Sequence, residues 1–179
     1  TADIRKEAGY PGIRATMRGE LDGAQIFVQV DIGFGDAVTP GPTAVTFPVL
    51  LDDMPSPVLS AYPKPTVIAE KLEAIVRFGR VNSRLKDYFD LWILLVTVDA
   101  DRADVTLAIA ATFARRNTPI PATTPSGLTD EFAEDPRVVA QWRAFTTRNQ
   151  LSTPDITETI SQLRAAVMPL FAMARDAQH

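Results

Sequence analysis

The sequence predicts an α+β fold in which a small antiparallel sheet precedes a helical domain. Two observations support this prediction. Apolar and polar residues alternate on both sides of a tight-turn signal in the first part of the chain, whereas the apolar residues after residue 65 recur at helical spacing. We therefore expect a sheet region over residues 1–64 and a helical domain over residues 65–179.

The first alternating region predicts a β-hairpin with a defined register. Its turn contains Asp22-Gly23, a dipeptide favoured in type I′ turns because both central residues need a positive φ. Pairing the residues that flank this dipeptide sets Ile13 opposite Ile32 and Arg14 opposite Asp31. One face of the hairpin is then apolar, and a slip of one residue would mix the two faces. We expect the apolar face in the core and a polar face that ends at Asp31.

Residues 33–62 are rich in proline and glycine. Proline cannot donate a ladder hydrogen bond, so it is confined largely to edge strands and loops. We expect this segment to run irregularly along the edge of the sheet. One short strand, Val58–Ala61, is expected to return to that sheet, which would then consist of the hairpin plus this strand.

Five helices are predicted for the remainder, over about 66–78, 83–96, 103–115, 136–148 and 154–175. Start and stop signals support them. Asp99-Ala-Asp101 is interpreted as a helix start, and Asp135-Pro136 as an N-cap followed by proline at the first helical position. Thr153-Pro154 gives a similar signal for the last helix.

The composition excludes several kinds of chemistry. The chain of 179 residues has no cysteine, and its single histidine is His179. Thiolate nucleophiles, disulfides, catalytic triads and histidine metal sites are therefore not expected. Carboxylates, lysines and hydroxyls remain, with a hard ion such as Mg²⁺. The formal net charge of −4 gives no global attraction for nucleic acid. The lack of cysteine, of a long apolar run and of an export signal favours the cytoplasm.

Lys71 is an unusual charge on the predicted helix 66–78. On a helical wheel it falls inside the apolar stripe, whereas Glu70, Glu73 and Arg77 fall opposite. One interpretation is a lysine whose stem packs along the core while its ammonium stays in water. The other is a lysine that points into a cleft and meets an anion there.

The predicted helix 83–96 is apolar around most of its circumference, yet Lys86, Asp87 and Asp90 share one stripe. Two carboxylates on a buried helix are costly unless cations accompany them. Either they form an ion-paired network with Lys86 and Arg84, or they belong to a functional site. Asp31 likewise has two interpretations: it is either an ion-pair partner of Arg14 or a metal ligand.

A further charged group lies on the predicted helix 136–148. Trp142, Arg143 and Arg148 would form an RNA-facing patch if the indole were exposed. A buried tryptophan with solvated arginines is the favoured interpretation, because large aromatic side chains are mostly buried.

Three segments together resemble the AbiEii/AbiGii toxin family of nucleotidyltransferases, which belongs to the DNA polymerase β-like superfamily. They are Val30-Asp31-Ile32-Gly33-Phe34-Gly35-Asp36, Ala69-Glu70-Lys71-Leu72-Glu73-Ala74 and Arg84-Leu85-Lys86-Asp87-Tyr88-Phe89-Asp90-Leu91-Trp92. The resemblance implies that the strands are part of a nucleotidyltransferase-type sheet. It also implies an NTP substrate, Mg²⁺, an acceptor such as tRNA or a protein, and a cognate antitoxin.

The resemblance implies a role for each matched position. Asp31 is similar to the third carboxylate of the family's sheet, so a catalytic and metal-binding role is expected. Lys71 is similar to the family's nucleotide-contacting lysine. Asp87 and Asp90 match positions associated with catalysis, and Arg84 and Lys86 are expected to bind nucleotide.

The family's first motif, Gly-Ser followed by Asp-x-Asp on a strand, is missing from this sequence. We expect that the chain is the C-terminal part of a longer protein and is inactive by itself, with an exposed sheet edge through which it self-associates. The alternative is a non-catalytic module with a degenerate nucleotidyltransferase fold that binds RNA or a protein.

Overall fold

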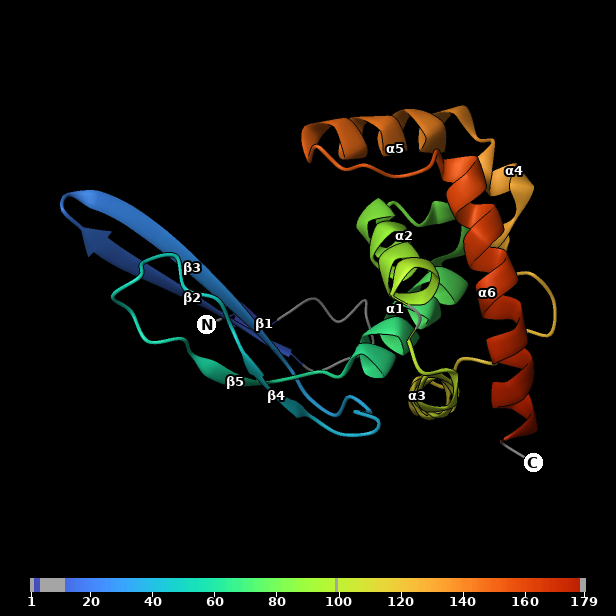
Figure 1. The fold of residues 1–179 in the computed structure, drawn as a ribbon, viewed down its shortest axis with the longest axis horizontal. Helices are drawn as coiled ribbons and strands as arrows, with labels where there is room; N and C mark the ends of the chain where they lie inside the picture. The colour runs from blue at the N-terminus through green and yellow to red at the C-terminus, as the bar shows by residue number, and fades with distance from the viewer. Residues whose placement is uncertain (1, 4–11, 99, 178–179) are drawn as a thin grey trace. The chain divides into compact units, whose positions relative to one another are not determined.

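Strands precede helices in the computed structural model, which describes residues 2–3, 12–98 and 100–177 (Figure 1). This order confirms the predicted α+β class. The chain divides into two compact units, Thr1–Asp36, which we call the hairpin unit, and Ala37–His179, which we call the helical unit.

The first unit is a three-stranded antiparallel sheet in the order β1-β2-β3. Its strands are β1 Ala2–Asp3, β2 Gly12–Leu21 and β3 Ala24–Gly33. The predicted hairpin register is confirmed, with Ile13 opposite Ile32 and Arg14 opposite Asp31. Asp22 and Gly23 have φ angles of 49° and 79°, as a type I′ turn requires.

The apolar face of this hairpin is exposed. Its exposed members include Met17, Val28, Val30 and Ile32. The prediction that this face lies in the core was therefore wrong. Alternation determines which side chains share a face of a sheet, but a hairpin cannot cover its own face, and the sequence pattern does not identify the covering layer.

The second unit opens with a separate two-stranded sheet. Strand β5, Val58–Ala61, occupies the predicted residues, but it pairs antiparallel with β4, Thr43–Thr46. The predicted return to the hairpin sheet was wrong, because β4 lies in the proline-rich segment that was expected to be irregular. The Thr66 hydroxyl bonds both the amide and the carbonyl of Thr39, at 2.9 and 2.8 Å, and so connects the segment before β4 to the first helix.

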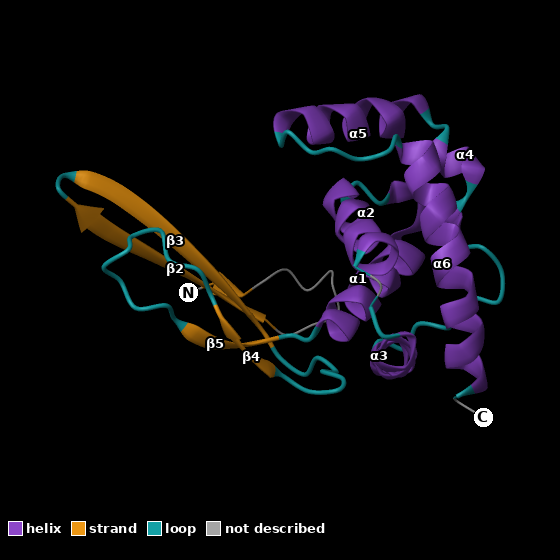
Figure 2. Cartoon of the chain, viewed as in Figure 1, coloured by secondary structure: helices purple, strands orange, loops and turns teal. Residues whose placement is uncertain are grey.

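Each predicted helical range contains a helix (Figure 2). The helices are α1 Lys64–Phe78, α2 Leu85–Trp92, α3 Arg102–Arg115, α4 Asp130–Ala133, α5 Pro136–Arg148 and α6 Ile156–Asp176. A π-helix over Ile93–Thr97 continues α2, and 3₁₀ turns occur at Gly79–Val81 and Ser126–Leu128. The short helix α4 was not predicted.

Side-chain caps mark the starts of α3, α4, α5 and α6. Asp101 accepts hydrogen bonds from the amides of Ala103 and Asp104, and Asp135 caps α5, as predicted. Asp99 lies outside the described residues. The last helix begins at Ile156, within two residues of the predicted start at about 154, and the cap is Asp155, which accepts from the amide of Glu158.

The core of the second unit lies among its helices. Helix α1 packs on α3, and both α2 and α3 pack on α6. Fully buried side chains include Ile68 and Leu72 of α1, Phe113 of α3 and Phe171 of α6. Trp142 is also buried and donates to the Pro154 carbonyl, which confirms it as a core residue. No described helix combines the length and the apolar character needed to cross a bilayer.

Candidate functional site

The Lys71 ammonium lies between α1 and α2 and contacts two carboxylates. Its Nζ donates to Asp87 Oδ1 at 2.6 Å and lies 2.7 Å from Asp90 Oδ2. The Lys71 side chain is 16% exposed and that of Asp87 is 4% exposed. The helical wheel therefore located Lys71 correctly on the inward side, and its charge is balanced there by α2.

Two further cations contact the same carboxylates from the solvent side. Arg84 Nε lies 2.9 Å from Asp87 Oδ2, and Lys86 Nζ lies 2.5 Å from Asp90 Oδ2. We call these five residues the lysine–aspartate cluster. The ion-paired network that the sequence left open is present, with Lys71 as an additional member. Three cations and two carboxylates give the cluster a net charge of +1.

Opposing effects set the protonation of this cluster. Burial acts to lower the pKa of Lys71, but the hydrogen bonds and charges of Asp87 and Asp90 outweigh it and raise that pKa above its ordinary value. Burial likewise acts to raise the pKa of Asp90, but Lys71 and Lys86 outweigh it and lower that pKa. Both groups therefore remain charged at neutral pH.

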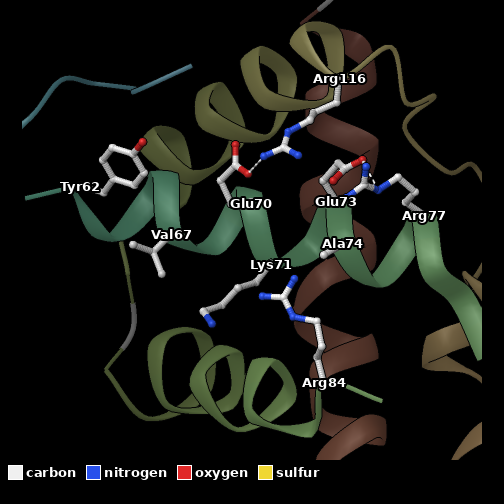
Figure 3. Close-up of a pocket in the computed structure, with 9 residues that line it drawn as sticks. All are labelled: Tyr62, Val67, Glu70, Lys71, Glu73, Ala74, Arg77, Arg84 and Arg116. Atoms are coloured by element: carbon white, nitrogen blue, oxygen red, sulfur yellow. Dashed lines mark hydrogen bonds and ion pairs between the residues drawn. The ribbon is translucent and has the colours of Figure 1, made fainter. Parts of the chain in front are cut away.

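A pocket of about 340 Å³ adjoins the cluster (Figure 3). Four cationic side chains line it, namely Lys71, Arg77, Arg84 and Arg116. Lys71 from α1 and Arg84 from the residue before α2 both extend into the space between the two helices. This concentration of cations suits an anionic ligand, since a phosphate group prefers guanidinium and ammonium donors.

Two acidic residues that also line the pocket were misplaced or missed by sequence reasoning. Glu73, expected on the face opposite the apolar stripe, is 1% exposed. Its Oε1 accepts from the Thr118 hydroxyl at 2.7 Å and lies 3.5 Å from Arg77 Nε. Glu70 forms an ion pair with Arg116. Thr118 and Arg116 follow α3, more than forty residues along the chain, so no local pattern on α1 could identify them.

Asp31 belongs to the hairpin unit, where it pairs with Arg14. Its Oδ1 and Oδ2 accept from Arg14 Nε and Nη2 at 2.7 and 2.8 Å. These hydrogen bonds, together with the guanidinium charge, outweigh desolvation and hold the pKa of Asp31 below its ordinary value. The ion-pair interpretation left open by the sequence is thus present in the structure.

The described residues do not fit a magnesium site. Magnesium requires several oxygen ligands in near-octahedral geometry. Within the described ranges, no three Asp, Glu or His side chains gather around a common point. Both carboxylate oxygens of Asp31 are also engaged by Arg14. A metal-binding role for Asp31 therefore stays a prediction.

A family model described as "Nucleotidyl transferase AbiEii toxin, Type IV TA system", where TA stands for toxin–antitoxin, matches residues 1–171. No curated protein and no solved structure matches the chain. The matched range includes Asp31 and the whole lysine–aspartate cluster.

Proposed function

This chain belongs to the AbiEii family of nucleotidyltransferase-like toxins of type IV toxin–antitoxin systems, and from this membership we propose that the full gene product transfers a nucleoside monophosphate from an NTP to an acceptor. Membership of a toxin–antitoxin family also implies a cognate antitoxin. In the proposed reaction, an acceptor hydroxyl attacks the α-phosphorus, forms a new P–O bond and releases its proton to water. The bond between the α-phosphorus and the bridging oxygen breaks, and pyrophosphate leaves with its electrons.

The observation that supports this proposal is the Lys71 ammonium beside a cation-lined pocket. A lysine ammonium has three N–H donors. Two are directed at Asp87 and Asp90, and the third can bond a phosphate oxygen. Because the two carboxylates fix the ammonium and keep it protonated, Lys71 would offer a positioned positive charge to the triphosphate.

The other members of the cluster have supporting roles in this proposal. Asp87 and Asp90 position Lys71 and keep it charged. Arg84 and Lys86 are exposed, so their cationic ends would approach the phosphates from the solvent side. Magnesium is an expectation from the family, and the role proposed for Lys71 does not depend on it.

The test is incorporation of labelled NTP into RNA or protein by the full gene product. Lys71→Ala should abolish incorporation, whereas Lys64→Ala should not, because Lys64 is an exposed lysine on the same helix outside the cluster. Full activity of Lys71→Ala would contradict the proposal.

RNA or protein binding without any incorporation would instead support the non-catalytic module. Labelling of tRNA, another RNA or the protein itself would identify the acceptor.

A further inference from the structure

Three ion pairs of the helical unit have exposed cations and mostly buried carboxylates. The side-chain exposures are 58% for Arg84 against 4% for Asp87, 71% for Lys86 against 19% for Asp90, and 84% for Arg137 against 17% for Asp135. Each pair is close to neutral, but its outward side is the cation. An approaching ligand would therefore meet positive charge, which the net charge of −4 conceals.

A groove of about 280 Å³ connects the elements that carry these pairs. It is lined by Arg80 and Ser83 from the segment before α2 and by Arg137 and Gln141 from α5. Arg148 is on the same flank of α5, since eleven residues of helix bring it to within about 20° of Arg137. Arg143 lies on the other flank, where it lines a different pocket with Thr157.

We propose that Arg80, Arg84, Lys86, Arg137 and Arg148 form a cationic face that binds the phosphodiester backbone of a nucleic-acid strand. Phosphates bind lysine and arginine with release of condensed counterions, which favours a row of separated, exposed cations. The cationic ends of Arg84, Lys86 and Arg137 are exposed and have several N–H donors, so each can contact a phosphate while it stays paired with its carboxylate.

The composition of the face favours nucleic acid over an acidic protein. Protein interfaces have an apolar core with aromatic anchors. The groove instead combines guanidinium groups with Ser83 and Gln141, and its only exposed large apolar side chain is Val81. Asp135 also lines the groove, but its side chain is mostly buried. Of the carboxylates that pair with these cations, Glu131, the partner of Arg80, is the exposed one, so it is the carboxylate that most opposes a polyanion.

The face leads toward the lysine–aspartate cluster. Ser83 lines the groove, and the next residue, Arg84, lines the pocket beside Lys71. A strand bound along the face could bring its end to Lys71 and serve as the acceptor. This last step rests on the proposed function, whereas strand binding itself does not.

The experiment measures fluorescence anisotropy of labelled 12-nucleotide RNA and DNA strands of one sequence, titrated with the chain over a range of salt concentrations. The double variant Arg137→Gln/Arg148→Gln should bind about tenfold more weakly at low salt. Its plot of log K against log[salt] should be shallower by about 1.4, that is by 0.7 for each lost phosphate contact. Arg143→Gln, from the other flank of α5, is the matched control and should bind like the wild type.

A second variant should change affinity in the opposite direction. Glu131→Gln removes the opposing carboxylate and should tighten strand binding about two- to threefold. Binding of RNA alone, or of RNA and DNA alike, supports the proposal and identifies the strand. No binding, equal weakening by Arg143→Gln, or equal competition by polyglutamate would overturn it. Strand binding without incorporation would contradict the proposed function only, and incorporation without binding at this face would contradict this inference only.

Discussion

The hairpin unit and the helical unit each contain a close ion pair between sequence-distant residues, and the two pairs differ in burial. Arg14 and Asp31 approach to 2.7 Å with side chains 44% and 46% exposed. Lys71 and Asp87 approach to 2.6 Å with side chains 16% and 4% exposed. Distance alone would rank these pairs as equal. The comparison shows that burial decides what each pair does for the protein.

An exposed pair replaces water contacts with a salt-screened attraction, so its loss is largely compensated by hydration. A buried pair behaves differently, because removing one partner leaves a charge without water or a counter-charge. Loss of one partner should therefore destabilise the protein more in the lysine–aspartate cluster than in the Arg14–Asp31 pair. The following variants test this difference, beginning with the largest expected effect.

Lys71→Met should lower the free energy of unfolding of the helical unit by about 3–5 kcal/mol, since Asp87 would be left buried without its inner cation. Urea unfolding followed by tryptophan fluorescence would measure this loss, because both tryptophans, Trp92 and Trp142, lie in the helical unit. Lys64→Met is the control. A loss below about 1 kcal/mol would show that the cluster is effectively solvated. Adding Asp87→Asn to Lys71→Met should restore part of the stability.

Gly127→Ala should cost about 1–3 kcal/mol through overpacking. An added Cβ would lie 2.9 Å from Tyr88 Oη and 3.0 Å from Ile75 Cγ2, inside the core of the helical unit. The matched change in the hairpin is Gly19→Ala, where the nearest atom, Ile26 O, is 3.9 Å away. Gly19→Ala should leave hydrogen exchange of the β2 and β3 amides unchanged or slower. Equal losses in both variants would contradict the contrast in packing between the two regions.

Local chemistry made the hairpin predictable. The Asp22-Gly23 turn and strict alternation determine the register residue by residue, because the side-chain period of a strand is two. What covers the apolar face depends on elements elsewhere in the chain or on a partner, and the exposed Met17 and Val28 show that the pattern does not contain this information.

The site was only partly predictable. Helical spacing placed Lys71 inward and grouped Asp87 with Asp90, but it could not show that the two helices face each other. Glu73 was assigned to the wrong environment because its partner Thr118 lies 45 residues away. A helical wheel describes one helix, whereas burial of a carboxylate depends on what neighbouring helices donate to it.

The pH dependence of stability should report on the charges of the lysine–aspartate cluster. The lowered pKa of Asp90 means that its stabilising contribution is present above the ordinary aspartate pKa of about 3.9 and is lost as the pH falls below it. The raised pKa of Lys71 gives a contribution that is present below about pH 10.4 and is lost as the pH rises through its folded value. Urea unfolding between pH 3 and 11 should therefore show a plateau with two falling limbs. Asp90→Asn should flatten the acid limb in the tryptophan signal, and an unchanged limb would contradict the role of Asp90.

Arg14→Gln should give the smallest effect. Because Arg14 and Asp31 are exposed, hydrogen exchange of the β2 and β3 amides should stay within error of the wild type at physiological salt. A clear loss of protection would mean that this pair holds the hairpin together, and the distinction drawn between the two ion pairs would fail.

Nucleotide binding by Lys71→Arg tests the account most directly, because arginine keeps the charge that balances Asp87 and Asp90 but cannot place a compact ammonium at the same point. Calorimetric titration of the full gene product with each NTP should give a Kd at least tenfold weaker for Lys71→Arg than for the wild type. Lys64→Arg should match the wild type, and unfolding curves should show that both variants are folded. An unchanged Kd in folded Lys71→Arg would contradict the claim that the buried lysine is the phosphate-binding group.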